Sequence, residues 1–184
     1  NLEPLQQRVL ERLIHTSGDF GIRDFLRFTP DSCLIGLSAL KQSSAIIADT
    51  SIATAAIKPM ANRINIPVHN VLNWAPEEAN ELYTRTAFGM KQAWQDLQLN
   101  TKDSVSPIVV IGSAPTALEA LLDLVDKNNH PPSLIIGMPV GFIGVEKSKQ
   151  RLISSNIPSI CLDGTRGGAS LAASVVNALI REII

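Results

Sequence analysis

The stretch SLIIGMPVGFIGVEKSK, residues 133–149, begins as a strand and ends as a helix. Its apolar run 134–136 is typical of a buried strand, and residues 145–147 have the character of a first helical turn. Apolar side chains continue through the loop between them, where a short polar connection would suffice. The glycine and proline residues of this loop are Gly137, Pro139, Gly141 and Gly144. We therefore expect the loop to lie against another molecular surface.

Short apolar runs alternate with longer amphipathic segments along most of the chain. The apolar runs are 45–48, 68–72, 107–111, 134–136 and 159–162. The amphipathic segments are 51–61, 76–97, 115–127, 145–154 and 168–181, preceded by helices expected at 2–16 and 32–41. Strands joined by helices form right-handed crossovers, which predicts a three-layer α/β/α sandwich with a mostly parallel sheet of about five strands. No linker or repeat interrupts the pattern, so residues 1–184 are expected to form a single domain.

The composition excludes several classes of protein. A formal net charge of −1 over 184 residues argues against a nucleic-acid binder, which usually carries a basic excess. No apolar stretch approaches the roughly 18 residues that a membrane span needs. Cys33 and Cys161 lie far apart and are expected to be buried thiols of a cytoplasmic protein. The chain begins at Asn1 rather than methionine, so an N-terminal piece is expected to be missing.

Three loops follow predicted parallel strands, at the edge where open α/β sheets bind ligands. The first loop, residues 113–116, starts a helix, and the free N–H groups of this helix could bind an anion or a carbonyl oxygen. The third loop, residues 166–168, contains an arginine and two glycines. Arginine suits a carboxylate or phosphate, and the glycines allow a ligand to approach the backbone closely. Each glycine can also be explained by turn geometry alone. The candidate contact residues are Ser113, Ala114, Pro115 and Thr116 in the first loop, Gly137, Pro139, Gly141, Phe142 and Gly144 in the second, and Arg166, Gly167 and Gly168 in the third.

Motifs for other chemistry are missing. The sequence has no G-x-G-x-x-G after a strand, no G-x-x-x-x-G-K-[ST] and no G-x-S-x-G. Its histidines have no neighbours at metal-ligand spacing, so no metal is expected. His15 ends the first helix, where a cation is favoured by the helix dipole whether or not it is catalytic. Arg85 falls in the longest predicted helix between Thr84 and Thr86, which are unfavourable in a helix interior and weakly hint at a site.

Five stretches of the chain resemble, in order, the precorrin-8X methylmutase family of cobalamin biosynthesis. They are RLIHTSGDF (12–20), TRTAFGM (84–90), VVIGSAPTALEALL (109–122), IIGMPVGFIGVEKSK (135–149) and GTRGGASLAASVVNAL (164–179). The resemblance implies an isomerase that moves a methyl group from C11 to C12 of precorrin-8X or cobalt-precorrin-8, giving hydrogenobyrinate or cobyrinate. Such an intramolecular reaction implies a tetrapyrrole substrate and no cofactor.

The resemblance also implies roles for individual residues. His15 matches the family's motif histidine, which would protonate the ring system, and histidine suits a general acid near neutral pH. Arg85, with Thr84 beside it, matches an arginine placed at the bound substrate. We expect the three loops to line the substrate pocket, with Met138, Val140 and Phe142 contacting the ring. A homodimer is expected, in which Arg85 reaches either its own site or that of the neighbouring subunit.

Other features depart from the family pattern. Ser113 stands where asparagine is usual, Thr165 where a second basic residue is common, and the segment 45–58 matches poorly apart from Asp49 and Ile57. The resemblance also implies an N-terminal segment that is expected to be missing from this chain. These departures leave a non-catalytic corrinoid-binding or carrier protein as the alternative, whereas the missing phosphate motifs disfavour a nucleotide-binding domain. Whether the substrate carries cobalt stays open.

Overall fold

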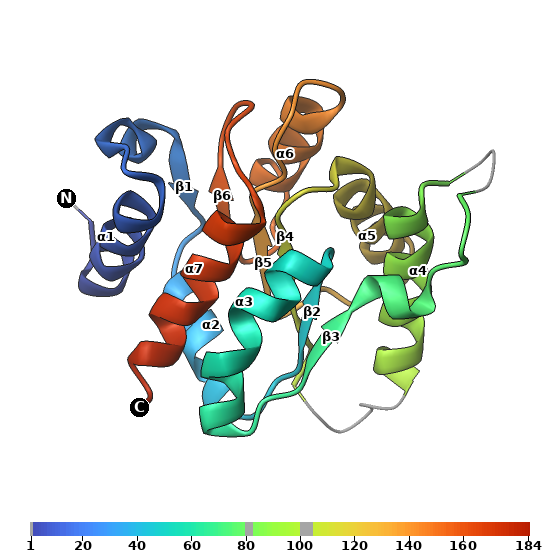
Figure 1. The fold of residues 1–184 in the computed structure, drawn as a ribbon, viewed down its shortest axis with the longest axis horizontal. Helices are drawn as coiled ribbons and strands as arrows, with labels where there is room; N and C mark the ends of the chain where they lie inside the picture. The colour runs from blue at the N-terminus through green and yellow to red at the C-terminus, as the bar shows by residue number, and fades with distance from the viewer. Residues whose placement is uncertain (1, 80–82, 100–104) are drawn as a thin grey trace.

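The computed structural model describes residues 2–79, 83–99 and 105–184. Its centre is a six-stranded sheet with the strand order β1-β6-β5-β4-β2-β3 (Figure 1). β1 is antiparallel to β6, and the other neighbouring strands of this sheet are parallel. The strands are β1 (Leu26–Phe28), β2 (Ile46–Ala48), β3 (Val68–Asn70), β4 (Ile108–Ile111), β5 (Leu134–Gly137) and β6 (Ser159–Leu162). The predicted α/β class and mostly parallel sheet are confirmed.

Helices cover both faces of the sheet (Figure 1). Successive strand residues point to opposite faces, so Ile46 and Ile108 join one buried cluster while Ile47 and Val109 join the other. Burial on both faces explains why the strands are apolar throughout. One face is covered by α1 (Pro4–Ser17), α2 (Ser32–Lys41), α3 (Ser51–Ala61) and α7 (Ala169–Arg181), and the other by α4 (Arg85–Leu99), α5 (Pro115–Asn128) and α6 (Val145–Ile153).

The sheet has one strand more than the sequence pattern predicts. This strand, β1, follows the 3-10 helix η1 (Phe20–Phe25) and is only three residues long. Three residues are too few to show the alternation of apolar and polar residues by which a strand is recognised in a sequence. Leu26 pairs with Leu162, the last residue of β6. Because β1 is antiparallel, the segment that enters it lies at the carboxyl edge of β6. The end of α1 is thereby brought toward the edge where the candidate loops lie.

The longest predicted helix starts later than expected. The prediction covered residues 76–97, but α4 begins at Arg85, and residues 80–82 lie outside the described part of the chain. The Thr84 hydroxyl accepts a hydrogen bond from the Ala87 N–H at 3.2 Å, as an N-cap side chain does. Threonine therefore caps this helix rather than weakening its interior.

The expected strand 68–72 is also shorter than predicted. It ends at Asn70, whose side chain accepts a hydrogen bond from the Leu72 N–H at 3.0 Å and starts the 3-10 helix η3 (Val71–Trp74). Another 3-10 helix, η2 (Asn62–Ile64), extends α3. The remaining predicted elements lie within a few residues of their observed bounds.

Both cysteines are buried, as predicted. Burial raises the pKa of Cys33 and that of Cys161 to about 12, so both side chains are neutral thiols at cellular pH. Over residues 2–79, 83–99 and 105–184, no helix is long and apolar enough to cross a membrane.

Candidate functional site

The three candidate loops lie side by side at one edge of the sheet. They follow β4, β5 and β6, which are adjacent and parallel (Figure 1). The Gly168 N–H donates to the Met138 carbonyl at 2.9 Å, and the Gly141 N–H donates to the Thr165 carbonyl at 3.2 Å. The loops after β5 and β6 thus form one hydrogen-bonded surface.

Two backbone N–H groups of the first loop are already occupied. Asp49, directly after β2, accepts hydrogen bonds through Oδ2 from the Ser113 N–H at 2.7 Å and the Ala114 N–H at 2.9 Å. Its side chain is fully buried, and burial raises the pKa of this carboxyl despite the opposing effect of its hydrogen bonds, chiefly those from Ser113 and Ala114. The Ser113 and Ala114 N–H groups are therefore not free to bind a ligand, contrary to the expectation for this helix start. An internal carboxylate takes the place of the predicted anion.

Glycine in these loops serves packing as well as access. A Cβ added at Gly167 would lie 2.1 Å from the Met138 carbonyl oxygen, so only glycine allows the two loops to meet. Met138 is fully buried and contacts the core, which corrects the expectation that it touches a ligand. Gly144 has a φ of +72° and directly precedes α6, a left-handed conformation that other residues adopt at a cost. Close approach at Gly167 is thus made by the protein's own backbone.

The tip of the second loop presents apolar side chains to the outside. Phe142 is 90% exposed and Ile143 is 91% exposed, while Val140 is about half exposed. Large apolar groups seldom cluster at full exposure unless they bind something. Ile143 was not singled out from the sequence, although it stands next to Phe142 in the same motif.

Arg166 of the third loop contacts the segment that follows α1. Its Nη1 lies 2.6 Å from Asp19 Oδ2, and its guanidinium carbon lies 4.9 Å from the centre of the Phe25 ring. Asp19 Oδ1 also accepts the Gly21 N–H at 2.7 Å, which starts η1. The stretch around His15 and the stretch around Arg166 are therefore joined directly. A ligand carboxylate at Arg166 would share the guanidinium with Asp19.

His15 lies in the last turn of α1 and is exposed. It lines a hollow of about 270 Å³ between α1 and α7. The other lining residues are Arg8, Glu11, Arg12, Ala178, Arg181 and Glu182. Three arginines against two carboxylates give this hollow a net positive charge, which suits an anionic ligand.

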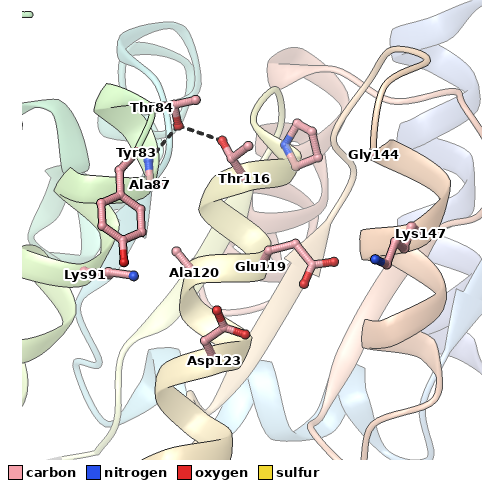
Figure 2. Close-up of a pocket in the computed structure, with 11 residues that line it drawn as sticks. Tyr83, Thr84, Ala87, Lys91, Thr116, Glu119, Ala120, Asp123, Gly144 and Lys147 are labelled. Atoms are coloured by element: carbon pink, nitrogen blue, oxygen red, sulfur yellow. Dashed lines mark hydrogen bonds between the residues drawn. The ribbon is translucent and has the colours of Figure 1, made fainter. Parts of the chain in front are cut away.

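A larger hollow of about 440 Å³ lies between α4, α5 and α6 (Figure 2). The Thr84 and Thr116 hydroxyls meet there at 2.8 Å, joining the start of α4 to the start of α5. Pro115 and Gly144 also line it, as do Tyr83, Ala87, Lys91, Glu119, Ala120, Asp123 and Lys147. The last seven were not predicted, because Tyr83 precedes α4 and the other six lie on the sides of helices.

The structure does not bring His15 and Arg85 into one hollow within a protomer. Arg85 is exposed, and its Nε donates to the Pro76 carbonyl at 2.8 Å. It lines neither of the two hollows just described. The other predicted residues fall into the carboxyl-edge loops, the α4–α5 hollow and the α1–α7 hollow, and Arg85 lies in none of these places.

Lys149 is a buried cation that was not predicted as part of the site. Its Nζ donates to the Gly164 carbonyl at 2.8 Å and to the Arg166 carbonyl at 2.5 Å. The signal in the sequence was a lysine within the GVEKSK segment of the opening stretch. Nothing in that segment alone shows that the lysine is buried.

Metal ligands are not gathered at any of these places. Across the ranges that the structure describes, no group of three or more histidine, cysteine, aspartate or glutamate side chains could hold a metal ion.

The sheet is mostly parallel, and three adjacent loops lie at its carboxyl edge. This arrangement is that of the open α/β proteins that bind small molecules at the carboxyl ends of their strands. The family model of CbiC, precorrin-8X methylmutase, matches residues 1–182, and the chain belongs to this family. It is an isomerase of cobalamin biosynthesis, a methylmutase that transfers a group within one molecule.

Known relatives are similar in sequence or in structure to nearly the whole of this chain. The precorrin-8X methylmutase of Pseudomonas aeruginosa is 35% identical over 183 residues, which are 96% of this chain and 84% of the relative. The cobalt-precorrin-8 methylmutase of Synechocystis is 31% identical and covers 98% of this chain and 86% of its own length. The crystal structure of precorrin-8x methyl mutase from Thermus thermophilus superposes with a TM-score of 0.86 at 30% identity, over 98% of this chain and 87% of that one.

Proposed function

We propose that this enzyme moves a methyl group from C11 to C12 of precorrin-8X or of its cobalt form. The product is hydrogenobyrinate or cobyrinate. The observation that carries the proposal is the joining of the His15 segment to the strand-end loops through Asp19 and Arg166. The names of the relatives, which include both kinds of methylmutase, support a tetrapyrrole substrate.

The methyl shift needs little chemistry from the protein. One C–C bond breaks and another forms within the same molecule, so atoms and electrons balance without a co-reactant. In the proposal, His15 donates a proton to the conjugated ring, which withdraws electron density from the ring and lowers the barrier to migration, and it takes the proton back once the methyl group has moved. Its imidazole is accessible to a ligand, and Arg8, Arg12 and Arg181 of the same hollow would attract the carboxylate arms of the substrate.

The carboxyl-edge loops would hold the flat ring. Phe142, Ile143 and Val140 offer apolar contact, and burying them against the macrocycle would remove a large exposed apolar surface from water. Arg166 would bind one carboxylate arm beside its pairing with Asp19.

A homodimer is part of the proposal, because His15 lines the α1–α7 hollow of a protomer and Arg85 of the same protomer does not. A two-fold pairing that brings Arg85 of one subunit to the His15 region of the other would complete the site. Trp74 gives no support to such an interface, since it packs against a buried cluster of its own subunit and its Nε1 donates to Asp96 at 3.0 Å. A cytoplasmic location and a single-domain organisation belong to the proposal as well.

The direct test incubates the protein with precorrin-8X and, separately, with cobalt-precorrin-8, and follows the absorption spectrum. Conversion to hydrogenobyrinate or cobyrinate supports the proposal and shows which form is the substrate. Binding of both forms without conversion would instead support the corrinoid carrier. A protein that neither binds nor converts either form would contradict both.

A further inference from the structure

The ammonium group of Lys149 is buried beneath the third loop and has no carboxylate partner among the residues that the structure describes. The side chain is fully buried, and none of the ion pairs among the described residues involves it. Its two described hydrogen bonds both go to the loop backbone, at Gly164 and Arg166. A buried charge without a counter-ion is costly, so a neutral residue here would be favoured unless the charge has a use.

The groups around Lys149 leave its charge largely uncompensated. Cys161, beneath it on β6, is a neutral thiol because burial raises its pKa to about 12. The Asp163 carboxylate is bound by the Gln150 side chain at 2.7 Å, by the Gly164 N–H at 2.8 Å and by Arg27 of β1 at 3.5 Å. Glu146, one turn earlier on α6, is exposed to solvent. The neighbouring positive charge, Arg166, is neutralised by Asp19.

We propose that Lys149 is a positioning residue of the substrate site, which fixes the loop carrying Arg166 and supplies a positive charge beneath it for the substrate's carboxylates. The two carbonyl groups that it binds flank Thr165, so the ammonium fixes the backbone on both sides of the loop's tip. Because the charge is buried, its attraction for a nearby carboxylate is weakly screened by solvent. This inference rests on the proposed function, since it requires a polycarboxylate ligand at the carboxyl edge.

The charge of Lys149 responds to pH in a range where the substrate carboxylates do not. Burial lowers its pKa to about 8, with Cys161, Asp163 and Glu146 acting in the opposite direction. The ammonium is therefore mostly charged at pH 7 and mostly neutral at pH 9.5. A neutral amine still donates hydrogen bonds, but the attraction for carboxylates is lost.

The experiment compares wild type with Lys149→Met, which keeps the length of the buried stem, and with Lys149→Arg, which keeps the charge. Lys127→Met, an exposed lysine near the end of α5 and so at the opposite edge of the sheet, controls for loss of one charge. Cyanide-free cobyrinate and hydrogenobyrinate are the binding probes, with Kd measured from pH 6.5 to 9.5. Hydrogen exchange of residues 163–168 is followed without ligand.

In wild type and Lys127→Met, we expect the affinity for the probe to fall severalfold as the pH rises through about 8. Lys149→Met should bind about tenfold more weakly at pH 7, with a matching rise in KM, a kcat within about threefold of wild type, and no further loss of affinity at higher pH. Its loop amides should exchange faster. Lys149→Arg should bind as wild type does at pH 7 and keep its affinity at pH 9.5.

A wild-type affinity that does not change from pH 7 to 9.5 overturns the electrostatic role, even if Lys149→Met does not fold. Unchanged exchange of residues 163–168 in a folded Lys149→Met overturns the positioning role. These outcomes differ from failure of the proposed function, in which wild type itself binds neither probe and converts neither substrate.

Discussion

Arg166 and Asp19 are 147 positions apart in the chain, yet their side chains form an ion pair at 2.6 Å. Both side chains are about half exposed, so the pair contributes at most about 1 kcal/mol to folding. Its effect is positional, because it ties the end of the His15 helix to the loop that follows β6. Two of the family's sequence motifs are joined by this one contact.

Asp19→Asn tests that connection. Asparagine can still accept the Gly21 N–H but no longer carries the charge that pairs with Arg166. We expect the free energy of unfolding to change by less than about 1 kcal/mol, while kcat/KM falls about threefold to tenfold. In a double-mutant cycle with Arg166→Gln, the kcat/KM of the double variant should be no lower than that of the less active single variant. Fully additive losses in kcat/KM would show that the two residues act independently.

His15→Ala tests the proposed proton donor. Turnover should fall by about 10² or more, the usual scale of a lost proton transfer, while the Kd of the product changes little. His130→Ala, in the exposed segment after α5, is the matched control and should behave as wild type. Single-turnover spectra of precorrin-8X conversion measure the effect. A His15→Ala enzyme with near wild-type turnover would rule out this role.

Mixing two inactive variants tests the shared site. If Arg85 acts in the site of the partner subunit, a mixed dimer of His15→Ala and Arg85→Ala contains one intact site. Random re-pairing should then restore about a quarter of the wild-type activity, since half of the dimers are mixed and half of their sites are intact. Light scattering at micromolar concentration establishes the dimer itself. No recovery of activity in mixtures shown to contain mixed dimers would place both residues in the same subunit's site, or exclude one of them.

Asp49 is expected to matter for the first loop through its hydrogen bonds. Asp49→Ala leaves the partly buried N–H groups of Ser113 and Ala114 without their acceptor and should cost about 2 kcal/mol in the free energy of unfolding. Asp49→Asn keeps an acceptor oxygen and should cost less. Chemical denaturation of both variants at pH 7 checks the order, and equal stabilities would contradict the capping role.

Asp49 should also make the stability of the protein depend on pH. Burial raises the pKa of Asp49 in the folded protein, so the folded state takes up this proton more readily than the unfolded state. Its contribution to stability is therefore largest at low pH and is lost as the pH rises through the folded pKa. The stability of wild type relative to Asp49→Asn should increase as the pH falls toward about 4. The opposite trend would mean that the amide bonds outweigh burial.

Gly167→Ala should destabilise the protein by about 1–3 kcal/mol, or more if the loops cannot separate. The added Cβ would meet the Met138 carbonyl oxygen at 2.1 Å, and this oxygen belongs to the loop backbone, where it also accepts the Gly168 N–H at 2.9 Å. Gly144→Ala is the control, because its Cβ meets no atom within 4 Å and only the left-handed backbone costs about 1 kcal/mol. Thermal unfolding of the two variants should show the larger loss for Gly167→Ala. Equal losses would mean that the close approach is easily relieved.

The sequence by itself determined the order and type of most elements. α3 spans residues 51–61 as the apolar spacing predicts, and α5 begins at the predicted proline, Pro115. These features depend on residues close together in the chain, where periodicity and helix-start residues act locally. The placement of three loops at one edge also followed from the sequence, because parallel strands leave their carboxyl ends on the same side.

Only the tertiary structure decided which groups occupy that edge. β1 exists because β6 offers it a partner 134 positions away, and Asp49 reaches the N–H groups of Ser113 and Ala114 from another strand. Whether Lys149 is a surface cation or a buried one depends on the loop that folds over it. The separation of His15 from Arg85 likewise follows from how helices pack on opposite faces. Burial, desolvation and long-range hydrogen bonds are properties of the assembled fold, and no local sequence pattern encodes them.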